Sequence, residues 1–148
     1  MGGGGTGRFT VTVVAVDDES DILTVIKKGL ETDGFGVETF TNAKAALDFI
    51  RGYDIKPEQA LILLSDVRMP GMNGFELTRT VRTFCPKIAV VLMTAFEIDK
   101  REFDKVMPST AVDAFITKPF RLDKLKMLIG KLKDVAESNK GISTGPEG

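Results

Sequence analysis

The sequence predicts an α/β domain in which a doubly wound, parallel sheet of five strands carries helices on both faces. Short apolar runs rich in β-branched residues alternate five times with longer stretches whose apolar residues recur at helical spacing. The strand-like runs, such as VVAV and IAVVLM, are almost entirely apolar, as in strands that are buried on both faces. Strands and helices that alternate in this way form parallel sheets with right-handed crossovers.

The limits of the predicted elements come from local residue types. β-branched and apolar runs mark the strands. The helix ends are marked by Gly34 after the first helix, Asn42 as an N-cap of the second and Pro108 after the fourth. In chain order we expect a strand at 9–16, a helix over 22–30, a strand at 36–40, a helix over 42–50, a strand at 61–64, a helix over 74–84, a strand at 88–93, a helix over 98–107, a strand at 112–116 and a helix over 122–135.

The size and composition suit one domain with a sizeable core. The chain has 148 residues, of which 43% are hydrophobic and 28% charged. Residues 1–7 are Gly-rich and residues 138–148 are polar and Gly-rich, so we expect flexible tails on either side of a domain at 8–137. Because only a short tail follows the last helix, we expect a stand-alone domain or one cut from a longer protein.

The composition also excludes several classes of function. With no His and one Cys, the chain has no internal disulfide, poor prospects for zinc or haem, and no His for acid–base catalysis. A net charge of -1 gives no sign of direct nucleic-acid binding. No apolar run is long enough for a membrane span, and the N-terminus is no signal peptide. We therefore expect a cytoplasmic protein whose metal, if any, is a hard cation bound by oxygen.

Polar residues follow the predicted strands at their carboxyl ends, where ligands bind in sheets of this type. Asp17 and Asp18 follow the first strand, Asp66 the third, Thr94 the fourth and Lys118 the fifth. If these strands are neighbours, three carboxylates meet at one edge and repel one another unless a cation joins them. Magnesium suits such a site, because it prefers oxygen ligands and takes one or two carboxylates together with phosphate oxygens.

A carboxylate can also attack phosphorus and form an aspartyl phosphate. In phosphoryl transfer the catalyst mainly positions groups and neutralises charge, which a magnesium ion and Lys118 would do here. Simpler interpretations stay open at this point. Asp66 alone could cap the turn that follows it, and Asp17 with Asp18 could be an N-cap pair for the next helix.

Four motifs together resemble the receiver domain of two-component response regulators, the family of the chemotaxis regulator CheY. They are VVAVDDE, LLSDVRMPGMNGFEL, VVLMTAF and AFITKPF, each at a predicted strand end, and the resemblance runs from about residue 10 to residue 135. The resemblance implies a flavodoxin-like, CheY-like fold with the strand order 2-1-3-4-5. It also implies that Asp66 is the phosphoacceptor and Asp18 the direct magnesium ligand, with Asp17 acting through water and Arg68 contributing its backbone carbonyl.

The resemblance assigns further roles on the other two strand ends. Lys118 matches the lysine that contacts the phosphoryl group, and Thr94 matches the switch hydroxyl. Ala95 matches the small residue beside the phosphoryl pocket, and Phe115 the switch aromatic. The bond between Lys118 and Pro119 corresponds to one that is cis in the family, although the sequence leaves the isomer open.

These roles predict a phosphorylation switch. A histidine kinase or phosphotransfer protein would phosphorylate Asp66, and the changed face would contact a downstream protein, with a homodimer as a further possibility. One alternative is a phosphohydrolase of the haloacid dehalogenase type, but that class has a second acid two residues after its nucleophile, where this chain has Arg68. The other alternative is a pseudo-receiver that takes no phosphoryl group; the complete set of acids, hydroxyl and lysine argues against it.

Overall fold

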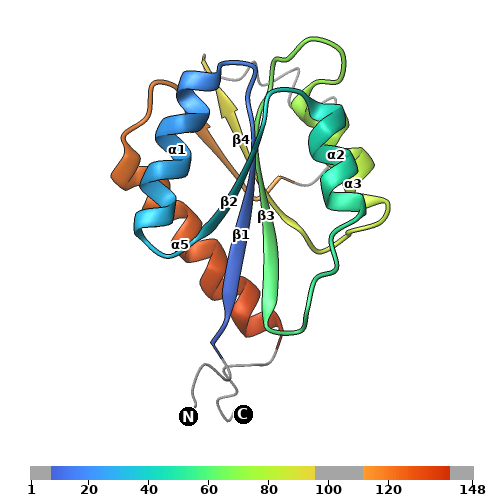
Figure 1. Ribbon diagram of the computed structural model, residues 1–148, viewed down its shortest axis with the longest axis vertical. Coiled ribbons are helices and arrows are strands. Elements are labelled where there is room, and N and C mark those ends of the chain that lie inside the picture. The colour runs from blue at the N-terminus through green and yellow to red at the C-terminus, as the bar shows by residue number, and fades with distance from the viewer. Residues whose placement is uncertain (1–7, 96–111, 141–148) are drawn as a thin grey trace.

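The computed structural model describes residues 8–95 and 112–140. Five parallel strands form one sheet in the order β2-β1-β3-β4-β5, which confirms the predicted fold class and strand order. The predicted helix at 98–107 lies outside the described residues. The described elements, shown in Figure 1, are β1 (Thr10–Val16), α1 (Ser20–Thr32), β2 (Gly36–Phe40), α2 (Ala43–Arg51), β3 (Gln59–Asp66), α3 (Gly74–Arg82), β4 (Ala89–Thr94), β5 (Ala114–Thr117) and α5 (Leu122–Asn139).

The sheet separates two apolar cores, one on each face. Helices α1 and α5 cover one face, and α2 and α3 cover the other (Figure 1). Successive side chains of a strand point to opposite faces, so β1 sends Val13 to the first core and Val14 to the second. Both are fully buried, which explains why the strands read as unbroken apolar runs rather than as alternating ones.

Capping hydrogen bonds and a glycine mark the ends of the helices. The side chain of Asn42 accepts a hydrogen bond from a backbone N–H in the first turn of α2, as predicted. At α3, Asn73 and Glu76 form a capping box in which each side chain binds the other residue's backbone N–H. Gly34, with a φ of 91°, follows the end of α1 in a conformation that favours glycine.

Several boundaries differ from the prediction because they depend on contacts between distant segments. Strand β3 continues to Asp66, two residues past the predicted end, and β5 covers 114–117 rather than 112–116. Helix α5 runs to Asn139, into the stretch that was predicted to be a tail. Just after it, the side chain of Lys140 donates hydrogen bonds to the backbone carbonyls of Lys56 and Gln59 and so attaches the helix end to the start of β3. Throughout 8–95 and 112–140, none of the helices has the length and apolar character of a membrane span.

Candidate functional site

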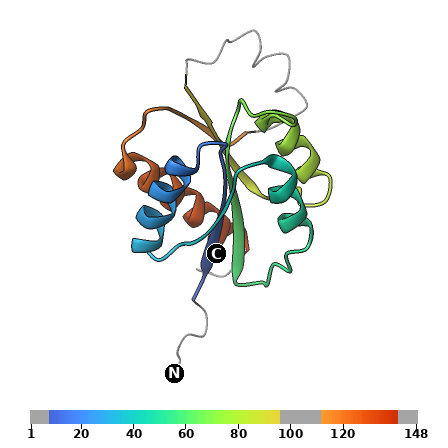
Figure 2. The same cartoon turned by 45° about the horizontal axis from the view of Figure 1, so that its top comes forward.

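The strand order places the site at the carboxyl edge of the sheet, which is at the top in Figure 1 and comes forward in Figure 2. Strands β1 and β3 pair directly, with Val16 opposite Ser65. Asp17 and Asp66 are the next residues on the two strands and are therefore neighbours. The chain crosses to one side of β1 to form β2 and to the other side to form β3, and ligands bind at such a reversal.

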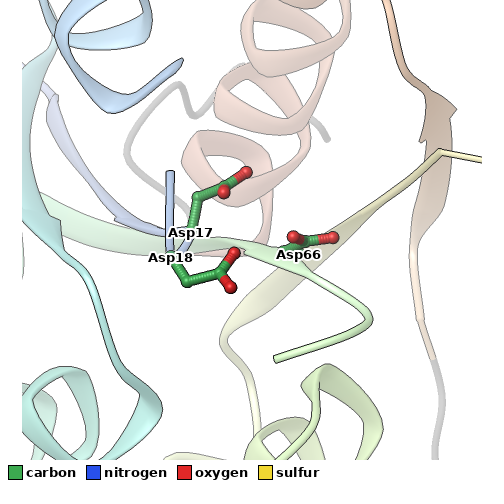
Figure 3. Close-up of side chains that lie close together, drawn as sticks. All are labelled: Asp17, Asp18 and Asp66. Carbon is green, nitrogen blue, oxygen red and sulfur yellow. The ribbon is translucent and has the colours of Figure 1, made fainter. Parts of the chain in front are cut away.

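Three carboxylates meet at this edge. Asp17, Asp18 and Asp66 each offer an oxygen atom, and these atoms all lie within 4.8 Å of one another. Figure 3 shows the three side chains close together at the strand ends. Asp17 is fully buried and Asp66 is 8% exposed, while Asp18 faces solvent. The structure therefore brings together the acids that lie far apart in the sequence and leaves one side of the cluster accessible.

Lys118 is the cation of this cluster. Its Nζ lies 2.6 Å from Oδ2 of Asp17 and 3.3 Å from Oδ2 of Asp66, and only 13% of its side chain is exposed. The backbone N–H of Lys118 donates to the carbonyl of Thr94. This hydrogen bond continues the pairing of β4 with β5 by one residue and holds the backbone of Lys118 at the strand end. The peptide bond between Lys118 and Pro119 is cis.

Burial and the neighbouring charges shift the pKa values of Asp66 and Lys118. Burial raises the pKa of the Asp66 carboxyl above its ordinary value of 3.8, and the negative charge of Asp17 raises it further, while Lys118 opposes both. Burial lowers the pKa of the Lys118 ammonium, but the contact with Asp17 and then the charge of Asp66 outweigh burial, so this pKa is raised above 10.5. The lysine is therefore charged at neutral pH, yet it does not fully offset the cost of ionising Asp66.

This balance makes Asp66 a stability cost in metal-free protein. Because its pKa is raised on folding, the ionised carboxylate destabilises the fold at neutral pH, and the cost disappears as the pH falls through the raised pKa toward 3.8. We expect Asp66→Asn to increase the free energy of unfolding by about 1 kcal/mol at pH 7, with a difference that shrinks on acidification. Urea denaturation in EDTA between pH 7 and pH 4 measures it; a variant less stable than wild type at pH 7 would contradict the sign.

A glycine holds α3 against the end of β3. A Cβ atom built on Gly74 would lie 2.5 Å from the carbonyl oxygen of Asp66, closer than real Cβ atoms approach backbone, and at a tight 3.1 Å from Cα of Val67. In addition, the N–H of Gly74 donates to the carbonyl of Val67 at 2.8 Å. The sequence predicts the start of a helix here but assigns Gly74 no role. The combination of an N-cap residue and a glycine directly after an acidic strand end was the available signal.

The other predicted residues lie around this cluster in different environments. Thr94, at the end of β4, is 9% exposed, and its neighbour Met93 pairs with Asp66. Ala95 and Arg68 are exposed. Phe115 is half-buried in β5, with its ring centroid 6.4 Å from that of Phe75 in α3.

Glu19 is an acidic residue near Lys118 for which the sequence predicts no role. The Oε1 atom of Glu19 lies 3.7 Å from Nζ of Lys118. Glu19 is also the N-cap residue of α1, yet its side chain makes no capping hydrogen bond. Its backbone N–H donates instead to Oδ1 of Asp17 at 2.9 Å. The N-cap position of α1 is therefore Glu19 rather than Asp17 or Asp18, although the Asp17 carboxylate does bind a backbone N–H at the start of this helix.

The donor set suits a hard divalent cation. All three side chains that converge are carboxylates, and no His or Cys takes part in the cluster. One of the acids is fully buried beside a second carboxylate, an arrangement that added positive charge would relieve. The residues present therefore fit a magnesium ion better than zinc or another soft metal.

Comparison with known proteins identifies the family. The family model of the response regulator receiver domain matches residues 13–130. The heme response regulator HssR of Staphylococcus epidermidis is 29% identical over 117 residues, which cover 78% of this chain and 48% of that protein. The C4-dicarboxylate transport transcriptional regulatory protein DctD of Rhizobium meliloti is 33% identical over 114 residues, or 77% of this chain and 23% of that protein. The chain thus spans from about a quarter to a half of the length of these curated relatives.

Solved structures agree with the sequence match. The CheY-like response regulator receiver domain protein from Methanospirillum hungatei has a TM-score of 0.76 and 25% identity, covering 88% of this chain and 98% of that one. A response regulator from Thermotoga maritima has a TM-score of 0.70 and 29% identity, covering 85% and 99%. With the family model matched over most of the domain, the chain belongs to the response regulator receiver domain family of two-component signalling.

Proposed function

We propose that Asp66 accepts a phosphoryl group from a histidine kinase or a phosphotransfer protein, in a magnesium-dependent reaction within the cytoplasm. The observation that carries the proposal is the cluster that the Lys118 ammonium forms with the carboxylates of Asp17, Asp18 and Asp66. This cluster lies at the carboxyl edge of the sheet and is accessible to solvent at Asp18. Such a set provides a nucleophile, a place for a cation and a fixed positive charge, which are the parts that phosphoryl transfer needs.

The chemistry is a displacement at phosphorus. An oxygen of Asp66 forms a bond to phosphorus while the bond from phosphorus to the donor's histidine nitrogen breaks, and the electron pair leaves with that nitrogen. Lys118, at 3.3 Å from the nucleophile, stabilises the negative charge on the transferred oxygens. Asp18, Asp66 and the carbonyl of Arg68 would hold a magnesium ion, with Asp17 acting through water, and the ion would supply positive charge that offsets the charge of the phosphoryl group.

The switch that follows is a shift between two conformations. We propose that the hydroxyl of Thr94 binds the new phosphoryl group and that Phe115 moves with it, so that the β5 face of the domain changes for a downstream protein. The half-buried ring of Phe115 supports this, because a side chain at the edge of the core can change its burial without disrupting the core. We propose no turnover of an external substrate, since the position two residues after Asp66 is Arg68 rather than a second acid.

Intact-mass measurement tests the proposal. The protein is incubated with acetyl phosphate or phosphoramidate, with magnesium or with EDTA, alongside Asp66→Asn. We expect wild type to gain one phosphoryl group in magnesium, and Asp66→Asn or EDTA to reduce the gain at least a hundredfold. Asp48→Asn is the matched control, because this aspartate is 61% exposed on α2 and should leave the gain unchanged.

Two results would contradict the proposal. The first is an unmodified wild type with both donors in magnesium, which would favour an interaction module that no longer takes a phosphoryl group. The second is an adduct of equal yield in Asp66→Asn, which would place the acceptor on another residue.

A further inference from the structure

The backbone between the carbonyl of Asp66 and the amide of Arg68 is fixed at every polar atom that it contains. The N–H of Val67 donates to the carbonyl of Met93 at 2.9 Å, and the carbonyl of Val67 accepts from Gly74 at 2.8 Å. A backbone hydrogen bond from Arg68 lowers the pKa of the Asp66 carboxyl. The remaining group, the carbonyl of Asp66, accepts a hydrogen bond from the hydroxyl of Ser65 at 2.9 Å. Of these four contacts, only the last comes from a side chain outside the site described above.

Ser65 occupies a place where an apolar side chain would ordinarily serve. It is fully buried in β3, opposite Val16 of β1 and Leu92 of β4. Burying a hydroxyl without a partner costs free energy, and here the partner is the carbonyl of the next residue in the chain. The hydroxyl therefore offsets its own desolvation by holding the peptide group that leaves Asp66.

The orientation of this peptide group affects two parts of the site, the side chain of Asp66 and the backbone of Arg68. Rotation of the peptide between Asp66 and Val67 would tilt the Asp66 side chain and would also turn the following residue, Arg68. The start of α3 lies so near the Asp66 carbonyl that a Cβ atom on Gly74 would be only 2.5 Å from its oxygen. The hydroxyl of Ser65 holds the same oxygen by a directional bond. Small misplacements of reacting groups cost up to about a hundredfold in rate.

We propose that Ser65 is a positioning residue for phosphoryl transfer, whose hydroxyl fixes the Asp66–Val67 peptide and through it the nucleophilic carboxylate and the Arg68 backbone. The inference rests on the proposed function, since it concerns the rate of that reaction. Ser65 acts through the backbone and contacts neither the phosphoryl group nor the cation.

The test compares Ser65→Ala and Ser65→Thr with wild type at saturating magnesium and donor. The expected result is a fall in the maximal phosphorylation rate of about tenfold for Ser65→Ala, with little change in the apparent affinity for donor and with most of the rate retained in Ser65→Thr. Thr78→Val is the matched control, because Thr78 is also fully buried and donates to a backbone carbonyl, that of Gly74, at 2.8 Å within α3. It should lower the urea midpoint as much as Ser65→Ala but keep the rate within about twofold.

Amide NMR provides a signature that a merely structural role would not give. In Ser65→Ala the Arg68 amide resonance should shift and lose protection from hydrogen exchange, whereas in Thr78→Val it should not. If Ser65→Ala is too unstable, Ser65→Cys, which keeps the shape with a weaker donor, makes the same comparison. A Ser65→Ala rate equal to wild type, or a fall equal to that of Thr78→Val, overturns the inference alone. A wild type that takes no phosphoryl group overturns the proposed function.

Discussion

Replacing Lys118 with glutamine is expected to lower the free energy of unfolding by about 3 kcal/mol and the rate of phosphorylation by about a hundredfold. The reason is the fully buried Asp17, whose Oδ2 lies 2.6 Å from Nζ of Lys118. Glutamine fills similar space but carries no charge, so the variant leaves a buried carboxylate beside a second one. Removing one partner of a buried pair costs more than the pair itself contributes.

The pH dependence of this effect follows from the lysine's own titration. The pKa of Lys118 is raised on folding above its ordinary 10.5 by Asp17 and Asp66, which outweigh the opposing effect of burial. Its stabilising contribution is therefore fully present below pH 10.5 and is lost as the pH rises through the folded pKa. The difference between wild type and variant should be constant from pH 7 to pH 9.

Urea denaturation and intact-mass kinetics measure the two effects separately. Lys44→Gln is the control, because Lys44 is 84% exposed and its ion pair with Asp48 on α2 lies in solvent. Such surface pairs contribute about 0.5 kcal/mol or less. If Lys118→Gln were no less stable than the control, the ion pair with Asp17 would have no energetic importance, and Lys118 would be retained for chemistry alone.

A second large effect is expected at Gly74. Replacement by alanine puts a Cβ atom 2.5 Å from the carbonyl oxygen of Asp66 and 3.2 Å from its carbonyl carbon, and both are backbone atoms that cannot rotate away. Either α3 moves outward or the end of β3 twists. We expect a loss of about 2–3 kcal/mol in the free energy of unfolding and a loss of at least tenfold in phosphorylation rate.

The helix α5 offers a matched control for this substitution. A Cβ atom on Gly130 would meet no atom within 4 Å, so Gly130→Ala should raise stability by about 0.8 kcal/mol through helix propensity alone. Thermal denaturation of both variants gives the comparison. Equal stability of Gly74→Ala and wild type would show that α3 has room to move, and the close approach would then have no role in holding Asp66.

The fold was predictable because its strands are buried on both faces. A short, wholly apolar run such as IAVVLM is expected in a strand that is buried on both faces of a sheet. Because these runs alternate with amphipathic helices, the sheet is expected to be parallel. The boundaries were less predictable, because they depend on contacts between distant segments. Asp66 ends β3 because its backbone pairs with Met93, and α5 continues to Asn139 where Lys140 reaches the carbonyls of the β3 loop.

The meeting of Asp17, Asp66 and Lys118 was predictable from the residue types, because charged side chains at strand ends stand out in the sequence, whereas their roles stay predictions. Asp17, Asp66 and Lys118 stand at strand ends, and the resemblance to receivers gave each a role. Ser65 and Gly74 were not found, because their contributions are a hydroxyl bonded to the backbone and the absence of a Cβ atom. Neither contribution can be recognised until the positions of the neighbouring backbone atoms are known.

Cation binding at the three carboxylates would make the stability of the domain depend on the cation concentration. A cation that binds Asp17, Asp18 and Asp66 only in the folded chain adds RT ln(1 + [cation]/Kd) to the free energy of unfolding. At a hundred times Kd this amounts to about 2.7 kcal/mol, a substantial part of the stability of a small domain. The population of folded protein is then linked to the ionic composition of its surroundings before any phosphoryl donor arrives.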